Sequence, residues 1–190
     1  MTFAKNLLMK LMFAVLLLGG AGQASAQNYS VTIDTAALGG GSAYLGLYFL
    51  GLADAAPATA TVSQLSGDFS GAAQLAGAVG GALPGPLVFG NGGELVQAVA
   101  LGGVLKFNVS FALGSGDGGT TFGWSLFNDS SYLGADGDLG VIALQPGATP
   151  YTVNSFSAVN SVTAVPEPAA YALLLAGLLC LAMLRARRAG

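Results

Sequence analysis

Apolar and polar residues alternate along much of the chain between residues 27 and 164. In the segment 29–35, Tyr29, Val31 and Ile33 alternate with polar residues. A period of two is typical of a β-strand with one buried face. The same reading predicts further strands at 43–50, 58–65, 104–113, 121–128, 139–145 and 152–159.

Clusters of Gly, Pro, Asn and Asp separate these segments, as at 114–119, and supply turns. No part of the region shows a capped apolar period near 3.6, which a surface helix would need. We therefore expect an all-β domain at 27–159, folded as an antiparallel β-sandwich that is jelly-roll-like or immunoglobulin-like. The Gly- and Ala-rich segment 75–93 is expected to be a loop with one short strand around Val88, and 160–165 a linker.

The first 26 residues have the order of a secretory signal peptide. Lys5 and Lys10 come first, an apolar core follows at 11–18, and Ala24 and Ala26 flank Ser25. Small residues at these positions are typical of a signal peptidase site, so cleavage would leave Gln27 as the new N-terminus. An uncleaved anchor helix is the alternative, but the apolar core is short for a membrane span.

The other end of the chain contains an uncharged apolar segment at 169–184, followed by a basic tail at 185–190. This segment predicts a transmembrane helix, flanked on its cytoplasmic side by Arg185, Arg187 and Arg188. Just before it, Pro166 and Pro168 favour an extended backbone that a processing enzyme can reach.

The order Val165, Pro166, Glu167, Pro168, apolar helix and basic cluster resembles the PEP-CTERM sorting signal of exopolysaccharide-producing Gram-negative bacteria, here 166–190. This resemblance implies processing by a membrane-embedded exosortase and delivery to the cell surface, extracellular matrix or biofilm. A simple tail anchor with a proline-rich stalk is the alternative. The patterns at 29–38, 58–69 and 122–130 are similar to those of small PEP-CTERM proteins of unknown activity, which implies an exported all-β module.

Composition removes several kinds of chemistry. The chain has no histidine and one cysteine, Cys180, so histidine-dependent hydrolases, histidine zinc sites and disulfides are excluded. Between residues 27 and 165, Lys106 is the only basic residue against eight acidic ones, and phosphate-backbone binding therefore has no electrostatic basis. Glu94 is the only glutamate in that region, which argues against a pair of catalytic carboxylates. We therefore expect no enzymatic activity and no nucleic-acid partner.

Two groups of residues are candidate sites. Asp129, Asp136 and Asp138 offer carboxylates for calcium, the one cofactor considered, although their spacing departs from the known calcium loop and favours solvated turns. Trp124, with Phe111, Phe122, Phe127 and Tyr132, offers an aromatic platform for a sugar ring. Phe122 and Trp124 alternate with polar or small residues, however, and this favours a place in the core.

These observations predict an exported structural or adhesive protein associated with exopolysaccharide or biofilm. Its expected partners are signal peptidase, an exosortase-like enzyme and exopolysaccharide, with an intermediate anchored in the inner membrane. The alternative is a carbohydrate- or calcium-binding β-sandwich module. Polymerisation through exposed strand edges is a further hypothesis.

Overall fold

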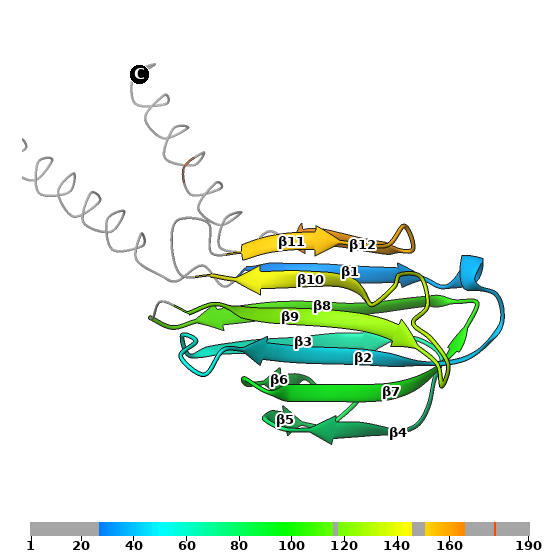
Figure 1. The fold of residues 1–190 in the computed structure, drawn as a ribbon, viewed down its shortest axis with the longest axis horizontal. Coiled ribbons are helices and arrows are strands. Elements are labelled where there is room, and N and C mark those ends of the chain that lie inside the picture. Colours follow the sequence, from blue (N-terminus) through cyan, green and yellow to red (C-terminus); the bar gives the residue numbers. More distant parts are fainter. Residues whose placement is uncertain (1–26, 116–117, 146–150, 166–176, 178–190) are drawn as a thin grey trace, which may run out of the picture.

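Two antiparallel six-stranded sheets pack face to face in the computed structural model, which describes residues 27–115, 118–145 and 151–165 together with Gly177 (Figure 1). The first sheet has the order β12 (Asn160–Val165), β1 (Asn28–Asp34), β8 (Val104–Leu113), β3 (Ala58–Ser66), β6 (Leu87–Phe89) and β5 (Val79–Gly81). The second has the order β11 (Tyr151–Ser155), β10 (Asp138–Leu144), β9 (Thr120–Phe127), β2 (Gly41–Gly51), β7 (Gly93–Leu101) and β4 (Phe69–Ala76). A short 3-10 helix, Ala36–Leu38, joins β1 to β2. The predicted all-β antiparallel sandwich is confirmed.

The core lies between the sheets and is built by the alternation seen in the sequence. On β9, Phe122, Trp124 and Leu126 are fully buried, as their shared face predicts. Phe107 of the first sheet meets Trp124 of the second at a ring-centroid distance of 6.0 Å and an interplanar angle of 81°. Such edge-to-face contacts add to the free energy gained by burying the rings.

The strand pairing is nested. β1 pairs with β8, β2 with β7 and β3 with β6, each pair antiparallel. Because the chain returns to β1 a second time through β12, Asn28 lies opposite Val165. The start of the first strand and the end of the last strand therefore lie side by side at one corner of the sandwich.

The segment 160–165, expected to be a linker, is instead strand β12. It pairs with β1 along six residues, from Asn28 opposite Val165 to Ile33 opposite Asn160. Asn160 is buried and Val162 packs against the core. The sandwich thus continues up to Val165, the residue immediately before Pro166 in the sequence.

The middle of the chain contains more strands than the alternation predicted. The short strand expected around Val88 is present as β6, but β4, β5 and β7 were not predicted. β7 was missed because its inward positions include the polar Gln97, which is buried and donates to the backbone oxygen of Ser70 over 2.8 Å. β4 was missed because most of its residues are exposed and a register shift between Ser70 and Gln74 interrupts its pairing with β7.

Among the described residues, no helix has both the length and the apolar character that a membrane crossing requires. The predicted signal peptide at 1–26 and the predicted helix at 169–184 lie outside the described residues.

Candidate functional site

A row of aromatic side chains lies on the outer face of the second sheet. Tyr44 on β2 alternates with the buried Leu45 and therefore points away from the core. Its ring stacks on that of Phe127 in the neighbouring β9, with centroids 5.6 Å apart and planes at 30°. Phe127 in turn meets Tyr132 edge-on, at 6.2 Å. We call Tyr44, Phe127 and Tyr132 the aromatic row.

Two glycines allow the rings to lie flat on the sheet. Gly46 faces Ser125 across the strands, and a Cβ atom at Gly46 would lie 3.1 Å from Cε1 of Phe127. Gly123 faces Tyr48, and a Cβ atom there would overlap the ring of Tyr48. Each glycine therefore gives a neighbouring ring the space that a side chain would fill.

Tyr48 connects the aromatic row to a carboxylate. Its hydroxyl donates a hydrogen bond to Oδ2 of Asp138, at the start of β10. The pKa of Tyr48 is raised, mainly by burial, then by this hydrogen bond and by the negative charge of Asp138, with a smaller electrostatic contribution from Tyr132. At neutral pH the phenol is therefore protonated and acts as the donor.

The loop at 128–137, between β9 and β10, positions the exposed members of the site. Its first turn is closed by Asn128, whose Oδ1 accepts the backbone N–H groups of Ser130 and Ser131, each at 2.9 Å. The N–H of Leu133 then donates to the carbonyl of Leu126 over 2.8 Å, which brings the loop back to β9. Tyr132, which remains 55% exposed, is held against Phe127 as a result.

An open hollow of about 490 Å³ lies where the loop that carries Tyr132 leads into β10. Its lining consists of Ala135, Asp136, Gly137, Asp138 and Phe156. Phe156 is 59% exposed, and Asp138 belongs both to the hollow and to the hydrogen bond with Tyr48. Tyr48 and the hollow therefore share Asp138, which lies opposite Ser125, two residues before Phe127 in β9. We call the aromatic row, Tyr48 and the hollow together the aromatic–carboxylate site.

The three aspartates considered for calcium are not brought together as a ligand set. In the part of the chain that the structure describes, no group of three or more Asp, Glu, His or Cys side chains is placed to hold a metal ion. Asp129 and Asp136 are exposed on the loop, whereas Asp138 is half-buried and accepts from Tyr48. The solvated-turn interpretation fits Asp129, while Asp136 and Asp138 belong to the aromatic–carboxylate site.

The aromatic platform predicted from the sequence divides into two groups. Phe111, Phe122 and Trp124 are buried in the core, and Phe127 and Tyr132 are on the outer face. Three further members of the site, Tyr44, Tyr48 and Phe156, were not predicted from the sequence. The alternation in 43–50 could have identified the first two, because they occupy the positions opposite to the apolar ones.

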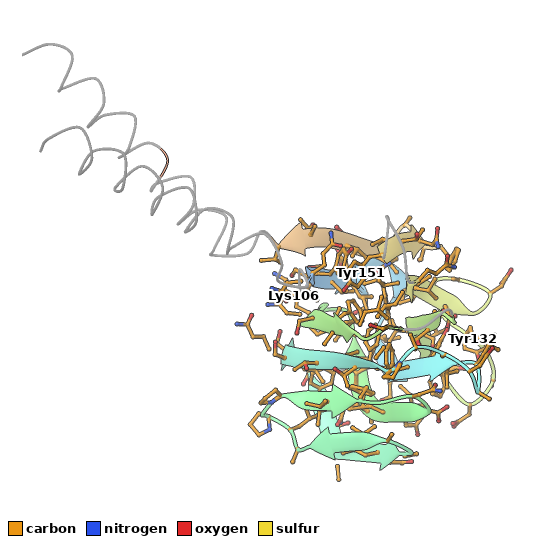
Figure 2. The ribbon with its side chains drawn as sticks, turned by 90° about the vertical axis from the view of Figure 1, so that its left-hand side faces the viewer. Lys106, Tyr132 and Tyr151 are labelled. Atoms are coloured by element: carbon orange, nitrogen blue, oxygen red, sulfur yellow. The ribbon has the colours of Figure 1, made fainter. Side chains whose placement is uncertain are left out.

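The loop 128–137 and the start of β10 lie at the end of the sandwich opposite to the start of β1 (Figure 1). At the other end of β1, the N–H of Asp34 donates to the carbonyl of Val159 over 2.8 Å. The N–H of Phe156 donates to the carbonyl of Leu139, the residue after Asp138, over 2.9 Å. Figure 2 shows Tyr132 and Lys106, the single basic residue of the domain, on opposite sides of the sandwich.

The predicted sorting and processing residues lie outside the described residues, with one exception. Val165 is the last residue of β12 and is 40% exposed. The others are Ala24, Ala26, Pro166, Glu167, Pro168, Arg185, Arg187 and Arg188.

Comparison of the chain with protein-family models, with curated proteins and with solved structures finds no match.

Proposed function

We propose that the protein is an exported cell-surface or extracellular-matrix protein, sorted by a C-terminal PEP-CTERM signal and acting as a structural or adhesive component of exopolysaccharide or biofilm. The observation that carries this proposal is the pairing of Asn28 with Val165. This pairing places the beginning and the end of the sandwich at one corner. In the sequence, the two ends adjoin the predicted processing segments 1–26 and 166–190. A domain held in this way presents its opposite end, with the aromatic–carboxylate site, away from the anchor.

The proposed sorting mechanism uses three segments in order. Signal peptidase cuts after Ala26, the helix at 169–184 holds the domain at the inner membrane, and an exosortase-like enzyme acts at the segment 165–168. Proline has no backbone N–H to donate to a strand ladder, so pairing like that of β12 has a natural end at Pro166. The enzyme can then act next to the sandwich without unfolding it.

Of the two topologies considered, we propose the jelly-roll-like one. Its support is the nested pairing of β1 with β8, β2 with β7 and β3 with β6. β5 departs from that plan, because it pairs with β6 in the first sheet rather than with β4 in the second.

Replacing two prolines tests the sorting proposal. In the double variant Pro166→Ala, Pro168→Ala, we expect the protein to stay in the membrane fraction with its C-terminal tail attached. The matched control is Pro146→Ala, Pro150→Ala, which changes two prolines of the segment between β10 and β11 and should leave delivery to the surface unaffected. Surface delivery of the first variant at the unmodified level, measured by cell fractionation and immunoblotting, would exclude the sorting role.

A second candidate function, a carbohydrate-binding module, is favoured by the aromatic–carboxylate site. The two functions are compatible, since an adhesive matrix protein needs a surface that contacts the polysaccharide.

A further inference from the structure

We propose that the aromatic–carboxylate site binds a glycan chain whose sugars carry free amino groups. This inference rests on the proposed function, because it names the component of the matrix that the domain would contact. It assigns the aromatic row to the sugar rings, and Asp136 and Asp138 to the ammonium groups.

The shape of the site fits sugar rings. Phe127 lies over Gly46 and Tyr48 lies over Gly123, so the rings form a low, broad surface in place of a narrow pocket. Pyranose rings have apolar C–H faces, and aromatic rings bind such faces by dispersion and burial. The hydroxyl of Tyr132 can donate to and accept from sugar hydroxyls, and that of Tyr48, which donates to Asp138, can accept.

The charge of the site selects among glycans. Asp136 and Asp138 line the hollow, and the only basic residue of the domain, Lys106, lies on the other side of the sandwich. Among the residues that the structure describes, neither carboxylate therefore has a neighbouring cation, and a polymer of uronic acids would be repelled. A protonated amine is attracted both by the carboxylates and by the faces of the nearby aromatic rings.

The position of the site on the sheet argues against a peptide ligand. An extended peptide binds a sheet by adding to an edge strand, where backbone groups are free. Tyr44 and Phe127, by contrast, lie on β2 and β9, which are interior strands with a partner on each side. Recognition at this place has to use side chains and ring faces.

Titration calorimetry of the full chain tests the inference. The protein is kept in a polyoxyethylene detergent, which has no sugar headgroup, and titrated with a β-1,4-linked glucosamine hexamer at pH 6. The comparison ligands are the fully N-acetylated hexamer, a galacturonate hexamer and hexalysine. We expect the glucosamine hexamer to bind roughly tenfold more tightly than the acetylated one, as one charge-assisted contact would give, with no binding of the galacturonate.

Three variants locate the binding. Tyr132→Ala and Asp136→Asn each change an exposed side chain and should weaken glucosamine binding about tenfold. Asp129→Asn removes the same charge from the same loop outside the hollow, and should leave binding within about twofold. Unchanged emission from the buried Trp124 checks that each variant is folded.

Equal binding of the acetylated hexamer, equal binding of hexalysine, or equal weakening by Asp129→Asn would each overturn the inference. The outcome is independent of the sorting test. A chain that reaches the surface but does not bind the glucosamine hexamer refutes only the ligand assignment, and a chain that binds it but is not delivered refutes only the sorting proposal.

Discussion

At the scale of single residues, one buried polar side chain joins both sheets at the edge of the core. Nε1 of Trp124 donates to Oδ1 of Asn160 over 3.1 Å, and Nδ2 of Asn160 donates to the carbonyl of Leu139 over 3.2 Å and to Oγ of Ser155 over 3.0 Å. Asn160 thus connects β12 to the opposite sheet. A buried polar group is stable only when it has such partners.

We expect Asn160→Ala to lower the free energy of unfolding by about 1–3 kcal/mol, because the indole N–H of Trp124 would stay buried without an acceptor. Urea unfolding followed by Trp124 emission measures the change. Asn154→Ala, at an exposed position of β11, is the matched control and should have little effect. A common midpoint for the two variants would contradict the role given to Asn160.

Tyrosine ionisation makes the fold sensitive to alkaline pH. The pKa values of Tyr29, Tyr48 and Tyr151 are all raised, chiefly by burial. The folded state then holds protons that the unfolded state releases above about pH 10, so stability is complete below that pH and falls as the pH rises further. We expect the melting temperature to drop steadily above about pH 10, and Tyr48→Phe to reduce the steepness of that drop. Parallel curves for the two proteins would show that Tyr48 does not contribute.

The sequence predicts part of the site and cannot predict the rest. Tyr44 and Phe127 are on strands, where alternation alone assigns them to the outer face. Tyr132, Asp136 and Phe156 are in loops, whose course depends on hydrogen bonds such as those of Asn128 and on the pairing of distant strands. The local spacing of apolar and polar residues does not determine the course of these loops.

At the scale of elements, the strength of the apolar alternation decides which strands the sequence predicts. The strands with strong alternation, such as β1, β3 and β8, were predicted nearly to the residue. In two of the missed strands apolar side chains do not mark the inward face, because β4 is mostly exposed and β5 contains two glycines. β12 was missed because a short polar strand next to a predicted sorting signal has the composition of a linker.

Truncation tests whether β12 belongs to the fold. A chain that ends after Val165 should unfold at the same urea concentration as the protein with its natural tail. A chain that ends after Val159 loses Asn160 and leaves β1 as an unpaired edge, and should be destabilised by more than about 3 kcal/mol or fail to fold. Equal stability of the two truncated chains would show that 160–165 is a linker and does not contribute to the fold.

At the scale of the whole molecule, the sandwich has two distinct ends. The pairing of Asn28 with Val165 defines the first, and the hollow with Phe156 lies at the second. The predicted signal peptide, the predicted sorting signal and the geometry of the domain all support the proposal of an exported module held at one corner.

Intact-mass measurement of the protein recovered from the cell surface tests this account most directly. We predict a polypeptide that begins at Gln27, retains Val165 and lacks Arg185, Arg187 and Arg188. A surface protein that still carries Met1 or the three arginines would contradict it.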